Sequence, residues 1–172
     1  MQLRVDNGGM RIGVISDTHG LLRPEVIAAL AGTEHILHAG DVGNPEILVE
    51  LRRIAPLTAI RGNIDRTGAC AQLPATEMLE LAGTTFYLLH DVQSLDLDPA
   101  SAGIGMVISG HSHKPGIERK NGVLYLNPGS AGPRRFSLPV TVAIVTVEKA
   151  VANAEIVELK PVSGGSRGKP DS

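Results

Sequence analysis

The chain has 172 residues and a formal net charge of −2, and 42% of its residues are hydrophobic, a composition typical of one globular domain. Two Phe, two Tyr and no Trp offer little surface for stacking bases, and the charge gives no excess of cations. A polymeric nucleic acid is therefore not expected as a partner. Cys70 is the single cysteine, which excludes an intrachain disulfide and fits a reducing compartment.

The two ends of the chain differ in composition from the middle. Residues 1–9 are polar and glycine-rich, which indicates a flexible extension and makes Met10 a candidate start of the fold. Residues 163–172 have the composition of a disordered tail, so the folded domain is expected over 10–162. No signal-peptide core and no apolar run of about 18 residues is present, and we expect a cytoplasmic protein without membrane contact.

The first 62 residues alternate short apolar runs with helical patterns. Apolar runs rich in β-branched residues predict strands over 11–16, 35–40 and 57–62. Segments 23–32 and 44–56 each carry a proline near the start and predict helices. This β-α-β-α-β order implies parallel strands joined by helical crossovers.

The second half of the chain is dominated by strand patterns. Segment 76–91 predicts two strands joined through Gly83, and segment 116–127 predicts a hairpin around Asn121-Gly122. Further strands are predicted over 105–110, 138–147 and 152–160. The whole is expected to be an α/β protein with two sheets packed together.

Five of the apolar runs end in side chains that can bind a metal ion. These side chains are Asp17, His19, Asp41, Asn63, His90, His111 and His113. In α/β sheets, sites form at the carboxyl ends of the strands, so these side chains are expected to converge. Carboxylates, an amide oxygen and imidazoles suit Mn²⁺, Fe²⁺, Zn²⁺, Ni²⁺ or Co²⁺, and the absence of a thiolate argues against a structural Cys-type zinc site.

Seven protein ligands are too many for one ion that keeps an open position. They suit two ions that share a bridging carboxylate, each with room for water or substrate. Two such ions can activate water and hold the oxygens of a phosphoryl group. Glycines beside the ligands would let the backbone turn tightly and approach the ions.

These segments also carry a family resemblance. The motifs SDTHG, HAGDV, RGNID, LLHD, SGHSH and NPGSAGPR, in this order over about residues 10–134, resemble those of the calcineurin-like metallophosphoesterase superfamily. They are most similar to its small, single-domain prokaryotic phosphodiesterase branch. The resemblance implies a four-layer α-β-β-α sandwich with a two-metal centre, where a metal-bridging water or hydroxide attacks the phosphorus.

The resemblance also implies a role for each ligand. One ion would be held by Asp17, His19 and His113, and the other by Asn63, His90 and His111. Asp41 would bridge the two ions. The residues implied to be catalytic are Asp17, Asp41, Asn63 and His90. Mn²⁺ is the ion that we expect first, with Ni²⁺, Zn²⁺, Fe²⁺ or Co²⁺ as alternatives.

The sequence departs from the family pattern at two positions. Many members follow the asparagine of the G-N motif with a histidine that binds phosphate or protonates the leaving group, and this chain has Ile64 there. Leaving-group protonation must then come from elsewhere or be dispensable, which favours diesters or other substrates with good leaving groups. A further histidine often stands two residues after His90, where this chain has Val92.

The expected function is therefore that of a metal-dependent phosphodiesterase acting on small phosphate esters. The alternatives are a phosphomonoesterase or nucleotidase, which Ile64 disfavours, and a non-catalytic scaffold of the same fold, as in the retromer scaffolding subunit. The complete set of ligand types disfavours the scaffold. Whether the chain forms a homo-oligomer stays open, because the strands beyond Val140 could be sheet edges or contacts between copies.

Considered singly, each of these residues also has an ordinary structural role. Asp17 could cap a helix and Asn63 could serve a turn. His38 is expected inside the sheet or behind the site rather than as a ligand. Arg61 could reach a phosphate or form an ion pair, and a structural role is expected for Arg134.

Overall fold

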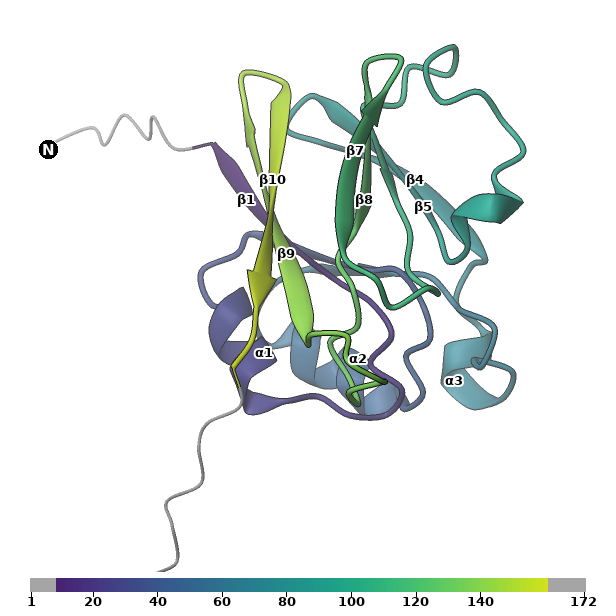
Figure 1. The fold of residues 1–172 in the computed structure, drawn as a ribbon, viewed down its shortest axis with the longest axis vertical. Helices are drawn as coiled ribbons and strands as arrows, with labels where there is room; N and C mark the ends of the chain where they lie inside the picture. The colour runs from purple at the N-terminus through teal and green to yellow at the C-terminus, as the bar shows by residue number, and fades with distance from the viewer. Residues whose placement is uncertain (1–8, 161–172) are drawn as a thin grey trace, which may run out of the picture.

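A computed structural model describes residues 9–160. The expected tail over 163–172 and all but Gly9 of the expected N-terminal extension lie outside the described residues. The described chain forms two five-stranded sheets that face each other, with α1 and α2 packed against one of them (Figure 1). No helix in this part of the chain is long and apolar enough to cross a membrane.

The first sheet has the strand order β10-β9-β1-β2-β3. Its strands are β1 (Met10–Ile15), β2 (His35–His38), β3 (Leu57–Ala59), β9 (Thr141–Glu148) and β10 (Val151–Glu158). As predicted, β1, β2 and β3 are parallel. On the other side of β1 lies β9, which is antiparallel to β1 and to its other neighbour, β10. The amino-terminal half of the chain therefore forms only three strands of this sheet, and the last two strands complete it.

Two helices connect the parallel strands. They are α1 (Pro24–Leu30) and α2 (Pro45–Arg52), both beginning at the predicted prolines. The side chain of Asn44 caps α2 by accepting a hydrogen bond from the backbone N–H of Glu46 at 2.9 Å. The helices bury their apolar faces against the outer face of the first sheet. A short helix, α3 (Gly68–Ala71), follows β3 and was not predicted.

The second sheet has the order β4-β5-β6-β8-β7. Its strands are β4 (Thr76–Leu81), β5 (Thr84–Leu89), β6 (Met106–Ile108), β7 (Gly116–Lys120) and β8 (Val123–Asn127). Both predicted hairpins are present, and Asn121 and Gly122 have the positive φ angles that a type I′ turn requires. The three inner strands β5, β6 and β8 are parallel, so this sheet also directs carboxyl ends toward one edge.

The two sheets enclose an aliphatic core to which Phe86 contributes the single large ring. A separate apolar cluster around Tyr87 and Ile104 covers the outer face of the second sheet. That face is covered by segment 91–105, which contains the short 3-10 helix η1 (Val92–Ser94). The expected layered α/β sandwich is confirmed. Its fourth layer is formed by segment 91–105, which contains only a short 3-10 helix.

Candidate metal centre

The seven side chains predicted to bind metal all lie in turns that follow parallel strands. Asp17 and His19 follow β1, Asp41 follows β2, Asn63 follows β3, His90 follows β5, and His111 and His113 follow β6. The structure brings all seven together at one edge, where the two sheets meet.

Asp17 presents one carboxylate oxygen to this cluster and anchors the other. Its Oδ2 accepts hydrogen bonds from Ser16 Oγ at 2.7 Å and from the backbone N–H of His111 at 3.1 Å. Its Oδ1 is buried and has no hydrogen-bond partner among the described residues. This oxygen lies 3.4 Å from Nε2 of His113, 3.6 Å from Nε2 of His19 and 3.8 Å from Nε2 of His90.

Asp41 is placed between imidazoles of the two predicted ligand groups. Its Oδ1 accepts a hydrogen bond from the backbone N–H of Ile64 at 3.1 Å. Its Oδ2 lies 3.2 Å from Nε2 of His90 and 3.4 Å from Nε2 of His19. Burial acts to raise the pKa of Asp41, but the hydrogen bonds with His90 and with Ile64 outweigh it and lower the pKa. The carboxylate is thus ionised and faces both groups.

The second predicted group gathers around the amide oxygen of Asn63. This Oδ1 lies 3.0 Å from Nε2 of His90 and 3.1 Å from Nδ1 of His111. Nδ1 of His90 lies 2.8 Å from the carbonyl oxygen of Ala39, so this nitrogen donates its proton and leaves Nε2 to face the site. Burial acts to lower the pKa of His90, but the hydrogen bond with Asp41 leads the opposing effects and the pKa is raised.

The separations between these atoms fit the coordination shell of a divalent ion. With bonds of about 2.1 Å, ligand atoms lie about 3.4 Å apart in a tetrahedron and about 3.0 Å apart in an octahedron. The contacts here run from 3.0 to 3.8 Å, and Nε2 of His19 lies 3.3 Å from Nε2 of His113. Together with the unpaired oxygen of Asp17, these distances show that the residues present fit a divalent metal ion.

The backbone at five of these ligands adopts the left-handed conformation. The φ angles are 55° at Asp17, 45° at His19, 56° at Asp41, 68° at His111 and 61° at His113. For a residue other than glycine, this conformation costs about 1–2 kcal/mol. Such strain clusters at functional sites, and here it turns each side chain sharply out of its strand end toward the cluster.

Glycines let the ligand turns approach each other closely, as the sequence indicated. A methyl group on Gly62 would collide with the carboxylate of Asp41, and one on Gly110 would collide with Ser16. Any side chain at either position would therefore push apart the turns that carry the ligands.

His38 lies behind the site, as expected, and joins two ligand turns through hydrogen bonds. The backbone N–H of Gly40 donates to Nδ1 of His38 at 3.1 Å, so Nε2 carries the proton and donates to Oγ1 of Thr18 at 2.9 Å. Thr18 Oγ1 then donates to the carbonyl of Val42 at 2.9 Å. Complete burial lowers the pKa of His38 to about 4, which keeps the ring neutral and the network intact near neutral pH.

Asp65 provides a second support that was not recognised in the sequence. Its Oδ2 accepts from the backbone N–H groups of Gly62 at 2.9 Å and Val42 at 3.1 Å, and its Oδ1 accepts from Gly43 at 3.0 Å. This buried carboxylate therefore ties the turn that carries Asp41 to the turn after β3. The signal in the sequence was an acidic residue inside the RGNID motif, close after the asparagine.

The segment that follows β8 closes the site from the side of the first sheet. The Ser130 hydroxyl donates to the carbonyl of Asp17 at 3.0 Å. The backbone N–H of Ala131 donates to the backbone carbonyl of Ser16, also at 3.0 Å. Nδ2 of Asn127 donates to the carbonyl of Gly110 at 2.9 Å. The segment thus fixes the turns that carry Asp17 and the His111-His113 pair.

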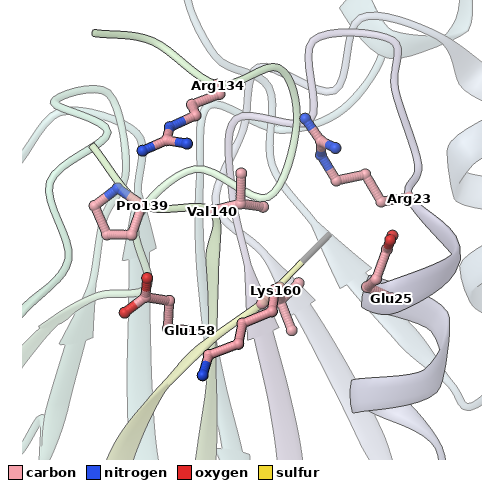
Figure 2. A pocket seen from close by; sticks show the side chains of 8 residues that line it. Arg23, Glu25, Arg134, Pro139, Val140, Glu158 and Lys160 are labelled. Carbon is pink, nitrogen blue, oxygen red and sulfur yellow. The ribbon is translucent and has the colours of Figure 1, made fainter. Parts of the chain in front are cut away.

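The arginines considered in the sequence lie at two different cavities. Nη1 of Arg61 donates to the carbonyl of Leu73 at 2.8 Å, and Arg61 lines a cavity of about 500 Å³ that reaches Asn63, His90 and His111. Arg134 instead lines a cavity of about 120 Å³ with Arg23 and other charged residues, and no predicted metal ligand contributes to that lining (Figure 2).

The fold and the donor set define the class of metallophosphoesterases. Residues 10–150 match the model of the calcineurin-like phosphoesterase superfamily domain, and the chain belongs to this superfamily.

Relatives and solved structures agree with this assignment. A probable metallophosphoesterase of Methanothermobacter thermautotrophicus is 36% identical over 160 residues, which cover 86% of this chain and 92% of the relative. The structure of an archaeal phosphodiesterase has a TM-score of 0.71 at 25% identity, covering 86% of this chain and all of that one. Vacuolar protein sorting 29 of Cryptosporidium parvum has a TM-score of 0.71 at 19% identity, covering 90% of this chain and all of that one, and shows the same fold.

Proposed function

We propose that this chain is a metal-dependent phosphodiesterase that hydrolyses small phosphate esters with two divalent ions. The observation that carries the proposal is the buried Oδ1 of Asp17, which lacks a hydrogen-bond partner among the described residues and lies between imidazoles from both sheets. A buried carboxyl oxygen without a partner is costly unless another group, such as a cation, binds it. The cytoplasm is the proposed location, since the single Cys70 fits a reducing compartment.

Seven residues would hold the two ions in this proposal. Asp17, His19 and His113 would hold one ion, Asn63, His90 and His111 would hold the other, and Asp41 would be shared by both. When bound, such ions activate water and neutralise the oxygens of the phosphoryl group. Mn²⁺ is the ion proposed first, because carboxylate and amide oxygens accompany the imidazoles.

The side chain of Ile64 supports a diester as substrate. The side chain of Ile64 is 42% exposed beside Asn63 and has no proton to give to a leaving group. Diesters of acidic alcohols need such a proton least, because their leaving groups are stable as anions. A phosphomonoesterase is the second candidate within the same class. A scaffold of the same fold is the non-catalytic alternative, and the converging donor set argues against it.

Metal reconstitution tests this function. The protein would be stripped with a chelator and assayed on bis(p-nitrophenyl) phosphate and on p-nitrophenyl phosphate, before and after addition of Mn²⁺, Ni²⁺, Co²⁺ or Zn²⁺. The expected result is no turnover after stripping, recovery with Mn²⁺ and a higher kcat/KM on the diester. A higher value on the monoester would favour the monoesterase, and no turnover with any ion would favour the scaffold.

A further inference from the structure

A large cavity adjoins one side of the candidate metal centre. It measures about 500 Å³, and three of the predicted ligands, Asn63, His90 and His111, form part of its wall. Two other cavities, of about 120 Å³ (Figure 2) and about 420 Å³, contain none of the seven predicted ligands in their walls. A substrate held at the metal centre would therefore extend into the larger cavity.

Three polar side chains that are not predicted ligands also line this cavity. They are those of Thr76, Ser94 and Asp96. Within residues 9–160, none of these three side chains is engaged in a hydrogen bond or ion pair. They present two hydroxyls, which can donate or accept, and one acceptor to whatever enters the cavity.

Apart from the predicted ligands and the ions that they would hold, the side chains that line the cavity carry a net negative charge. Asp91 and Asp96 contribute two negative charges, and Arg61 contributes one positive charge while one of its nitrogens is bound to Leu73. A second phosphate or a carboxylate close to Asp91 and Asp96 would be repelled by these two side chains. An uncharged group with hydroxyls would instead find hydrogen-bond partners without that repulsion.

The volume sets the size of the group. Small-molecule sites usually measure about 300–1,000 Å³, and this cavity falls within that range. One phosphate group held by the ions would leave most of it to solvent. The group beyond the phosphorus must therefore be of the size of a sugar ring or a nucleoside if it is to fill the space.

We propose that this cavity binds one of the two alcohol groups of the phosphodiester substrate, and that this group is an uncharged, hydroxyl-bearing sugar or nucleoside. Asp96 and Ser94 are its specificity-determining residues, because they line the cavity, are not predicted ligands and make no side-chain hydrogen bond among the described residues. The inference rests on the proposed phosphodiesterase function and adds the class of alcohol to it.

A pair of chromogenic diesters tests the inference. Thymidine 5′-(p-nitrophenyl phosphate) and bis(p-nitrophenyl) phosphate release the same nitrophenol but differ in the second group. We expect the Mn²⁺-loaded protein to have the higher kcat/KM on the thymidine ester. Asp96→Ala should lower the ratio of the two kcat/KM values by about fivefold or more through a higher KM on the thymidine ester, because it removes a hydrogen-bond acceptor from the cavity.

Two further variants complete the test. Ser94→Ala should lower the same ratio by a smaller factor, and it provides a second measurement if Asp96→Ala folds poorly. Gln93→Ala is the matched control, since Gln93 is an exposed neighbour in η1 that does not line the cavity, and its ratio should equal that of the wild type.

The outcomes separate the inference from the function on which it rests. Hydrolysis of both diesters with no preference for the thymidine ester, or an unchanged ratio in both Asp96→Ala and Ser94→Ala, overturns the inference and leaves the phosphodiesterase function standing. Hydrolysis of neither diester with any divalent ion overturns the function, and the inference falls with it.

Discussion

The two sheets contribute different chemistry to the same site. The turns of the first sheet supply the oxygen donors Asp17, Asp41 and Asn63 together with His19, whereas the turns of the second sheet supply imidazoles. Neither sheet holds a complete ligand set for either proposed ion. The candidate metal centre therefore lies at the interface between the sheets, and its residues converge only when the sheets are packed together.

The turns of the two sheets are also supported by different groups. In the first sheet, the turns are joined by buried polar side chains, His38 and Asp65, that bind several backbone groups each. In the second sheet, the side chain of His111 is 47% exposed and contacts Asn63 across the interface. His90 and His113 are buried, so the exposed imidazole of His111 is the least confined of the three histidines of the second sheet.

Removing the charge between the two groups should have the largest effect. We expect Asp41→Asn to lower kcat on bis(p-nitrophenyl) phosphate by about 10³-fold or more, because one charged bridging donor is worth several kcal/mol to a two-ion site. Glu148→Gln, at the far end of β9, serves as the control and should keep wild-type activity. A value for Asp41→Asn above about one-tenth of wild type would contradict the bridging role.

Acid should weaken the first sheet through His38. The pKa of His38 is about 4 in the folded protein and 6.5 in an unfolded chain. Between these two pH values the unfolded state binds a proton at this residue and the folded state does not. The free energy of unfolding should thus fall as the pH drops from about 6.5 to 4, by about 2 kcal/mol at pH 5. Urea unfolding of metal-free protein at pH 7.5 and pH 5 measures this.

A neutral replacement at the same position separates His38 from other titrating groups. The variant His38→Gln should show a pH dependence shallower by about one proton across this window. An equal slope in the variant and the wild type would show that His38 does not carry the effect, whatever the absolute stability of the variant.

Loss of one accepting oxygen at Asp65 should cost about as much stability as acid does through His38. Asp65→Asn replaces one accepting oxygen with an amino group that faces backbone N–H donors, and we expect it to cost about 2 kcal/mol in free energy of unfolding. It should also weaken metal binding about 10-fold or more, since a support of ligand turns is lost. Glu155→Gln, exposed on β10, should change neither quantity, and similar values for the two variants would refute the role of Asp65.

The exposed imidazole of the second sheet should matter least to the fold. We expect His111→Ala to change the free energy of unfolding of metal-free protein by less than about 0.5 kcal/mol, because its side chain is half exposed. The variant should bind one equivalent of metal where the wild type binds two, as measured by elemental analysis of the purified protein. Two retained equivalents would remove His111 from the ligand set.

Local patterns in the sequence were sufficient for most elements of the fold. The alternation of strands and helices up to β3, and the hairpins at Gly83 and Asn121-Gly122, follow from periodicity and turn chemistry that act within a few residues. The pairing of β9 with β1, and the place of β8 between β6 and β7, could not be predicted in this way. Such pairings join residues far apart in the chain, and no local pattern specifies which edge a strand will meet.

The same limit applies to the site. The ligand types at the strand ends were visible, because parallel strands gather their carboxyl ends. The sequence did not reveal the left-handed backbone at Asp17 and His111, nor the hydrogen bonds made by Asp65 and His38. Both features depend on contacts between turns from distant segments of the chain. Those contacts decide which atom of each side chain faces the site.

The central position of β1 has a consequence for the order of events during synthesis. Asp17 stands at the end of β1, which pairs on one side with β2 and on the other with β9, made last but one among the described strands. Its carbonyl is also bound by Ser130, from a segment made just before β9. A nascent chain that ends before residue 141 would therefore contain all seven donors but lack β9, whose pairing with β1 positions Asp17. Metal loading should then follow near-complete synthesis of the chain.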